Sequence, residues 1–276
     1  MATYDRFHRI TPPTERSCRV PRGTEPPLPH RRDAAFEGTT PVTTRPLRLF
    51  CLPHAGGSAV VYHPWRRGLA RVAEVVPTEL PGHGTRRGEP LSTDLRQVVA
   101  DLTARVRPLV NDPFALFGHS FGALLAFELA RELTAAGTPP SALLVSGRDG
   151  PAVPAPGPAV HALPTARLLD RLRLLDGIPP ALARDGELLE LLLPPLRADM
   201  KMVEEYVRAP GPSLTCPIWV AVGSLDPIAT AEGQRRWAEE TSAPCRLVSV
   251  AAGHMLLDHP GFLRELTREL ASHSGR

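Results

Sequence analysis

The chain has 276 residues, enough for one large domain with a sizeable core, and its hydrophobic content of 42% and charged content of 22% are ordinary for a globular protein. The net charge of +3 comes almost entirely from arginine, because Lys201 is the only lysine. No apolar run is long enough to span a bilayer, the N-terminus has no apolar signal-peptide core, and no block of like charge marks a nucleic-acid footprint. We therefore expect a cytoplasmic protein that binds neither membrane nor nucleic acid.

The four cysteines Cys18, Cys51, Cys216 and Cys245 are widely scattered and form no Cys-x-x-Cys pair. This spacing predicts neither a zinc site nor a redox pair. Cys51 and Cys216 border predicted strands, so we interpret them as small core residues. We expect no metal ion and no other cofactor.

Residues 1–44 are rich in proline and arginine and have little apolar periodicity. The pairs Pro12-Pro13 and Pro26-Pro27 forbid long helices there. We expect a flexible extension, with an over-called translation start as the alternative.

Residues 45–147 alternate predicted strands with predicted helices. Short apolar runs predict strands at 47–52, 73–80, 114–117 and 141–147, and apolar residues at helical spacing predict helices at 62–72, 95–109 and 123–133. Ser92 or Thr93 is the expected cap of the second helix, with Asp94 in its first turn.

The pattern changes at residues 148–208, where no strand is predicted. A proline-rich loop is followed by two leucine-rich segments, 163–175 and 186–208, which are predicted to form helices. Pro194-Pro195 is expected to break or kink the second of them. Short apolar helices inserted between core strands indicate a helical lid.

Residues 209–276 return to the earlier alternation. Strands are predicted at 218–223 and 245–250, and helices at 232–240 and 262–271. Strands alternating with helices predict an α/β protein, with a mostly parallel central sheet flanked by helices. Residues 45–147 and 209–276 then form one α/β core, and residues 148–208 form the lid inserted in it.

The segment Gly118-His119-Ser120-Phe121-Gly122 has the pattern Gly-x-Ser-x-Gly. It follows a predicted strand and precedes a predicted helix, which is the setting of a nucleophile elbow. The serine of an elbow lies on a strained turn, and its glycines lack the Cβ atoms that would clash there. Ser120 is therefore the predicted nucleophile.

A serine hydroxyl needs a base to take its proton, and in an α/β-hydrolase an acid and then a histidine follow the serine along the chain. Asp226 follows the strand at 218–223, and His254 follows the strand at 245–250. We predict that His254 is the general base and that Asp226 orients it. Asp149, after the strand at 141–147, is the rival acid, and His259 and His273 are weaker candidates for the base because neither directly follows a strand.

An oxyanion hole needs two backbone N–H donors. The residue after the nucleophile, Phe121, is expected to supply one, and Ala55 in the glycine-rich loop after the first strand the other. Three further histidines are expected to be structural or to line the pocket: His54, His83 and His119.

Several segments together resemble the type II thioesterases, the stand-alone α/β-hydrolases of polyketide and nonribosomal peptide synthesis. They are Leu52-Pro53-His54-Ala55-Gly56-Gly57-Ser58, Glu79-Leu80-Pro81-Gly82-His83-Gly84, the elbow around Ser120, Leu196-Arg197-Ala198-Asp199, Gly223-Ser224-Leu225-Asp226-Pro227 and Gly253-His254. The resemblance covers about residues 46–270. The first loop and the Leu-Arg-Ala-Asp segment are its more specific parts.

The resemblance implies hydrolysis of acyl groups from the phosphopantetheine thiol of acyl or peptidyl carrier proteins, which removes stalled or mis-primed chains. It implies the triad Ser120, Asp226 and His254 and the oxyanion donors Ala55 and Phe121. We also expect no cofactor and a monomer. The chain departs from the pattern in its N-terminal extension and at Arg148-Asp149-Gly150. The alternatives are a chain-releasing or cyclising thioesterase, a carboxylesterase, and a non-catalytic binding module with a hydrolase fold.

Overall fold

The computed structural model describes residues 46–110, 113–155, 157, 159–173 and 185–273. All of them belong to one compact unit, Thr43–Arg276. The predictions for residues 1–44, including Cys18, lie outside the described residues.

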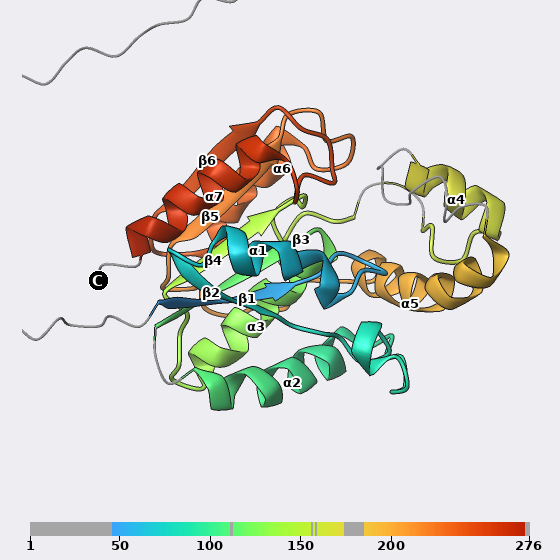
Figure 1. Cartoon of the computed structure of the whole chain (residues 1–276), viewed down its shortest axis with the longest axis horizontal. Coiled ribbons are helices and arrows are strands. Elements are labelled where there is room, and N and C mark those ends of the chain that lie inside the picture. The colour runs from blue at the N-terminus through green and yellow to red at the C-terminus, as the bar shows by residue number, and fades with distance from the viewer. Residues whose placement is uncertain (1–45, 111–112, 156, 158, 174–184, 274–276) are drawn as a thin grey trace, which may run out of the picture. The chain divides into compact units, whose positions relative to one another are not determined.

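Six parallel strands form the central sheet in the order β2-β1-β3-β4-β5-β6 (Figure 1). Every residue of β3 and β4 is buried, as expected for the inner strands of a parallel sheet that is covered on both faces. The predicted parallel α/β architecture is confirmed. The strands are β1 (Leu47–Leu52), β2 (Ala73–Pro77), β3 (Phe114–His119), β4 (Ala142–Ser146), β5 (Ile218–Gly223) and β6 (Cys245–Val250).

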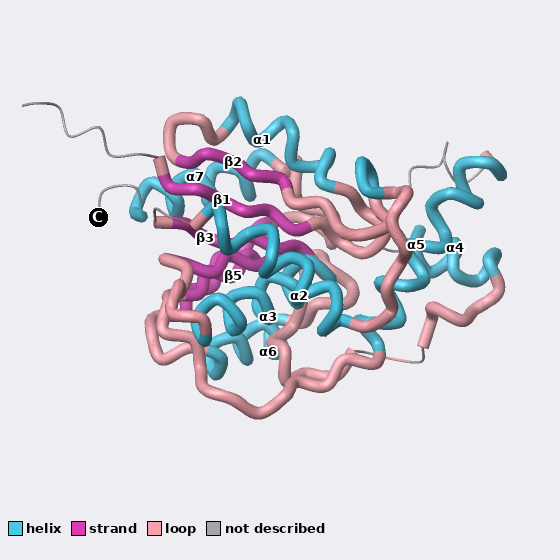
Figure 2. The backbone as a smooth tube through the Cα atoms, turned by 90° about the horizontal axis from the view of Figure 1, so that it is seen from below, coloured by secondary structure: helices cyan, strands magenta, loops and turns pink. Residues whose placement is uncertain are grey.

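Helices cover both faces of the sheet and enclose two apolar cores. One core lies between the sheet and helices α2 and α3, and the other between the sheet and helices α1 and α7. Figure 2 shows α1 and α7 on one side of the strands and α2, α3 and α6 on the other. These helices are α1 (His63–Gly68), α2 (Leu95–Val106), α3 (Phe121–Ala135), α6 (Ala231–Arg235) and α7 (Pro260–His273).

Several predicted boundaries need correction. The helix predicted at 62–72 is a 3₁₀ turn at Ala59–Tyr62 followed by α1, and the one predicted at 232–240 is α6 followed by a 3₁₀ turn at Arg236–Glu240. The cap of α2 is Asp94 and neither Ser92 nor Thr93. Its carboxylate accepts the N–H of Arg96 at 2.9 Å, because its extended backbone turns the side chain toward the first turn of the helix.

The segment between β4 and β5 contains no strand among its described residues, as predicted. Its helices are α4 (Thr165–Arg173) and α5 (Gly186–Glu204), which lie at one end of the sheet (Figure 1). Leu168, Leu169 and Leu172 of α4 pack against Leu196 of α5 in a small separate core. That the segment acts as a lid stays a prediction.

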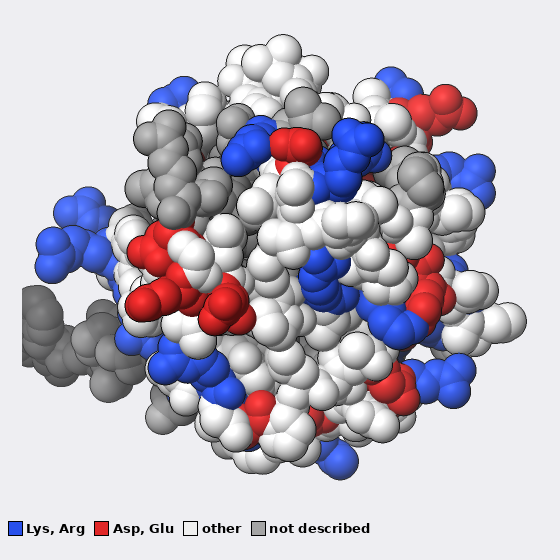
Figure 3. Space-filling model, turned by 90° about the vertical axis from the view of Figure 1, so that its right-hand side faces the viewer, with Lys and Arg blue, Asp and Glu red and all other residues white. Residues whose placement is uncertain are grey.

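The sequence predicts a break or a kink of the helix at Pro194 and Pro195. Helix α5 continues through both prolines, so a break is wrong, and a kink stays a prediction. The two prolines remove two helical N–H donors, but the turns beyond them are held by burial of Leu196, Ala198 and Met202. The face of the molecule seen in Figure 3 carries positive and negative side chains scattered among uncharged ones, including Lys or Arg atoms near its centre.

The described cysteines are free, and Cys51 and Cys216 are buried, as predicted for core residues. Burial raises the pKa of the Cys216 thiol to about 11. Among the helices that the structure describes, none is long and apolar enough to cross a membrane.

Candidate active site

Ser120 lies on the turn between β3 and α3 and has a φ of 55°, the one positive φ of a non-glycine residue in the described part of the chain. The flanking glycines make this turn possible. A Cβ on Gly118 would lie 2.0 Å from the carbonyl oxygen of Gly122, and a Cβ on Gly122 would lie 2.1 Å from the carbonyl oxygen of Leu52. The strand, strained turn and helix predicted around Ser120 are therefore present.

His254 lies between Ser120 and Asp226 and makes hydrogen-bonding contacts with both. Its Nε2 is 3.2 Å from Ser120 Oγ, and its Nδ1 is 2.8 Å from Asp226 Oδ2. Ser120, Asp226 and His254 follow different parallel strands, whose carboxyl ends meet at one edge of the sheet. The fold thus brings together the three residues that the chain order suggested.

The carboxylate of Asp226 is fixed by three donors. Its side chain is 0% exposed, and its second oxygen accepts the N–H groups of Ile228 at 2.9 Å and Ala229 at 3.1 Å. Burial by itself raises the pKa of Asp226, but the hydrogen bond and charge of His254 and the two backbone donors outweigh it and hold this pKa below its ordinary value. A fixed anion at this point requires the proton of His254 on Nδ1 and leaves Nε2 free to accept.

Two neutral histidines lie beside His254. The ring centroids of His119 and His254 are 5.1 Å apart, and His54 follows at 6.1 Å from His119. Burial, reinforced by His254, lowers the pKa of His54 to about 4 and that of His119 well below its ordinary value. His119 Nδ1 is 2.9 Å from Ser146 Oγ, so this ring packs between β4 and the catalytic candidate.

The rival candidates have other partners. Asp149 accepts the N–H of Thr230 at 2.8 Å, just ahead of α6, and burial raises its pKa. His259 accepts the N–H of Gly261 at 3.1 Å, and His273 is paired with Glu269 at 3.1 Å. The structure thus places Asp226, and not Asp149, at His254.

The two predicted oxyanion donors come from neighbouring strands. Phe121 is the first residue of α3, where backbone N–H groups have no partner within the helix. Ala55 lies in the loop of residues 53–58 after β1, called here the β1 loop. Leu52 at the end of β1 pairs in register with Gly118 of β3, so the β1 loop and the Ser120 turn leave the same edge of the sheet.

Two further residues hold the β1 loop, and sequence reasoning gave neither of them this role. Asp199 Oδ2 accepts the N–H of Gly56 at 2.8 Å and lies 3.0 Å from His83 Nε2. Both belong to segments that contributed to the family resemblance. That resemblance was the one signal available, since these residues are far apart in the sequence.

The fold and the arrangement of Ser120, His254 and Asp226 define an α/β-hydrolase. A family model described as "Thioesterase domain" matches residues 47–270. The chain therefore belongs to the thioesterase family, and the resemblance predicted from its sequence is confirmed.

Individual relatives agree with this membership. The chain is 36% identical to a "Probable cadicidin biosynthesis thioesterase" of Streptomyces griseus, over 86% of this chain and 68% of that protein. It is 36% identical to the "Thioesterase PikA5" of Streptomyces venezuelae, over 84% of this chain and 83% of that one. A solved structure of "the type II thioesterase BorB from the borrelidin biosynthetic cluster" is 41% identical, with a TM-score of 0.75 over 82% of this chain and 93% of that chain.

Proposed function

We propose that this protein is a cytoplasmic, monomeric editing thioesterase of a polyketide or nonribosomal peptide pathway. It hydrolyses acyl groups from the phosphopantetheine arm of an acyl or peptidyl carrier protein. The observation that carries the proposal is the hydrogen-bonded series Ser120–His254–Asp226 in a chain of the thioesterase family. The biosynthetic setting is supported by the names of a cadicidin biosynthesis thioesterase and of a type II thioesterase from the borrelidin biosynthetic cluster.

The first half of the reaction transfers the acyl group to the enzyme. His254 Nε2 takes the proton of Ser120 as Oγ attacks the thioester carbonyl carbon. The tetrahedral intermediate collapses with cleavage of the carbon–sulfur bond, and His254 returns the proton to the leaving pantetheine sulfur. Asp226 stabilises the imidazolium that exists between these two proton transfers.

The second half releases the acid. His254 takes a proton from water, the resulting hydroxide adds to the ester carbonyl of acyl-Ser120, and the serine oxygen leaves with the proton held by His254. The products are a carboxylic acid and the free enzyme. In both halves the backbone N–H groups of Ala55 and Phe121 donate to the developing oxyanion.

The α4–α5 segment supplies the lid and the acyl chamber. Leu191 and Leu192 of α5 line a small cavity together with Gly56 and Gly57 of the β1 loop, and Leu188 and Leu191 are exposed, so apolar surface is available to an acyl chain. An apolar pocket discriminates weakly between chains, because one methylene is worth only about 1–3 kcal/mol. Such a chamber suits an enzyme that removes many different acyl groups.

The test presents one acyl group in four forms: on a carrier protein, on coenzyme A, on a short thiol and as an oxyester. We expect the highest kcat/KM for the carrier-bound thioester and no hydrolysis by a Ser120→Ala variant. Far faster hydrolysis of the oxyester would identify a carboxylesterase, and a cyclic product would identify a cyclising thioesterase. Either result would refute the editing function.

A further inference from the structure

Asp199 is a buried acid of α5 that lies outside the proposed triad. Its side chain is 1% exposed, and one oxygen, Oδ2, serves both the N–H of Gly56 and Nε2 of His83. Gly56 directly follows Ala55, the proposed oxyanion donor. A single carboxylate oxygen therefore joins α5, the β1 loop and the turn that carries His83.

The contacts of His83 require a charged ring. Nδ1 lies 2.8 Å from the carbonyl oxygen of Pro81, and Nε2 lies 3.0 Å from Asp199 Oδ2. The Pro81 carbonyl is an acceptor, and so is an ionised Asp199 carboxylate, which together place a proton on each ring nitrogen. Burial disfavours this charge, but the hydrogen bond and charge of Asp199, the Pro81 carbonyl and the charge of Glu79 together raise the pKa of His83. Burial raises the pKa of Asp199, whereas the hydrogen bond and charge of His83 and the N–H of Gly56 act to lower it.

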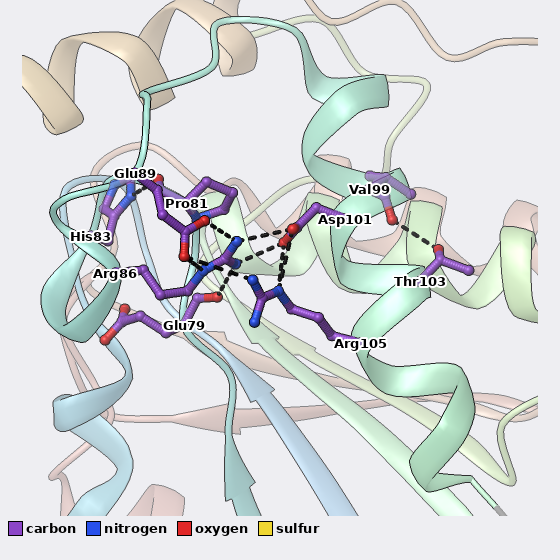
Figure 4. A network of polar contacts seen from close by, with 9 residues as sticks. All are labelled: Glu79, Pro81, His83, Arg86, Glu89, Val99, Asp101, Thr103 and Arg105. Carbon is purple, nitrogen blue, oxygen red and sulfur yellow. Dashed lines mark hydrogen bonds and ion pairs between the residues drawn. The ribbon is translucent and has the colours of Figure 1, made fainter.

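The turn that carries His83 is itself held rigidly (Figure 4). Arg86 donates to the carbonyl oxygen of Glu79 at 3.1 Å, to Asp101 of α2 at 2.7 and 2.9 Å, and to Glu89. The side chain of Glu79 accepts the N–H of Ala59, just beyond the β1 loop, at 3.0 Å. These contacts fix the position of the turn, and therefore the position of the His83 ring beside Asp199.

The β1 loop also packs tightly against α5. Gly56 has a φ of +68°, and a Cβ on it would lie 2.9 Å from the Cβ of Leu196. Leu196 and Asp199 are three residues apart and therefore lie on the same face of α5. One residue of that face packs on Gly56 and the other accepts its N–H, which leaves the β1 loop little freedom.

A buried ion pair is weak support for stability, because desolvation of both charges offsets most of their attraction. The position of this pair, next to a proposed oxyanion donor, indicates a geometric role. We propose that Asp199, charged and paired with cationic His83, is a positioning residue that aims the N–H of Ala55 at the reacting carbonyl oxygen. The inference rests on the proposed function of Ala55. It implies that the oxyanion hole is complete only when α5 packs against the β1 loop.

Asp199→Asn tests this inference, because the amide keeps an oxygen near Gly56 but loses the charge that His83 requires. We expect kcat for thioester hydrolysis to fall at least ~10-fold, up to the roughly 10²–10³-fold cost of removing one oxyanion donor, with little change in KM. Affinity for a trifluoromethyl ketone, which forms an oxyanion adduct with Ser120, should fall in parallel with kcat/KM. A loss of stability alone would not move these two quantities together.

Glu204→Gln is the matched control on the same helix. Glu204 is 11% exposed, accepts the N–H groups of Val160 at 2.7 Å and His161 at 3.2 Å, and pairs with the His161 ring. It is a carboxylate bound to backbone and histidine like Asp199, but it does not contact the β1 loop. We expect this variant to keep kcat within ~2-fold of the wild type, whatever its effect on stability.

The charge of His83 is measured independently in the wild-type protein by long-range ¹H–¹⁵N correlation, with the His83→Gln variant used for assignment. The pKa of the His83 ring is expected to lie above the ordinary 6.5, with both ring nitrogens protonated at that pH. A ring that is already neutral at pH 6.5 would overturn the proposal without any need for the Asp199 variant to fold. A folded Asp199→Asn enzyme with wild-type kcat and inhibitor affinity would also overturn it. Failure of the proposed function is a different result, namely no thioester hydrolysis by the wild type or undiminished hydrolysis by Ser120→Ala.

Discussion

Asp226→Asn is the sharpest perturbation of the proposed triad, because it changes one atom of a side chain that is 0% exposed. In the native protein one oxygen of Asp226 accepts from Ile228 and Ala229, and the other lies 2.8 Å from His254 Nδ1. The amide oxygen of Asn can keep the two backbone donors. Its NH₂ group then faces His254 and requires an unprotonated Nδ1.

This change reverses the tautomer of His254. The proton moves to Nε2, which lies 3.2 Å from Ser120 Oγ and can no longer accept the serine proton. We expect kcat to fall by about 10⁴-fold, which corresponds to ~5 kcal/mol of transition-state stabilisation. The fold should persist, because the shape of the side chain and its two backbone bonds are retained.

The assay follows release of free thiol from an acyl-pantetheine thioester, with circular dichroism as the check of folding. Asp149→Asn is the control, since Asp149 is bound to Thr230 and not to His254. It should keep kcat within a few-fold of the wild type. A folded Asp226→Asn enzyme with more than about a tenth of wild-type kcat, or a larger loss in Asp149→Asn, would refute the assignment of the acid.

Three further predictions concern stability, measured as the free energy of unfolding in denaturant. Gly122→Ala places a Cβ 2.1 Å from a main-chain oxygen and should cost ~3 kcal/mol or more, whereas Gly88→Ala, with no atom nearby, should cost less than ~1 kcal/mol. Arg86→Gln should cost ~2 kcal/mol, because the Arg86 side chain is only 9% exposed and its removal leaves carboxylate and carbonyl acceptors without this donor. Arg105→Gln should cost ~0.5 kcal/mol or less, because the Arg105 side chain is 50% exposed and its ion pairs are weakened by solvent. The pKa of His54 is about 4 in the folded protein and 6.5 in the unfolded chain, so only the unfolded chain takes up this proton as pH falls from 6.5 toward 4. Stability should therefore decline over that window by ~3 kcal/mol more in the wild type than in His54→Gln, and equal declines would refute the buried neutral ring.

The strands and the order of the site residues were predictable because both depend on short, contiguous segments of the sequence. The runs at 47–52, 218–223 and 245–250 coincide with β1, β5 and β6, since short apolar segments bounded by loop residues have few alternatives. Ser120 and His254 were identifiable because each follows such a strand. Their mutual distance then follows from the parallel sheet, which gathers the carboxyl ends of its strands at one edge.

Features that depend on tertiary packing were not predictable in the same way. Continuation of α5 through Pro194 and Pro195 depends on burial of its later turns, which outweighs two lost hydrogen bonds. The contact of Asp199 with Gly56 spans 143 residues of sequence, and that with His83 spans 116. No local periodicity encodes a contact between such distant segments.

The proposed mechanism depends on transfer of the acyl group to Ser120 during hydrolysis. Rapid-quench mass spectrometry of the wild-type protein mixed with an acyl-pantetheine thioester, followed by peptide mapping, measures this directly. We expect an added acyl mass on the peptide that contains Ser120, formed at least as fast as turnover and absent from Ser120→Ala. Thioester hydrolysis that proceeds with no acyl group on Ser120, or that persists undiminished in Ser120→Ala, would contradict this mechanism.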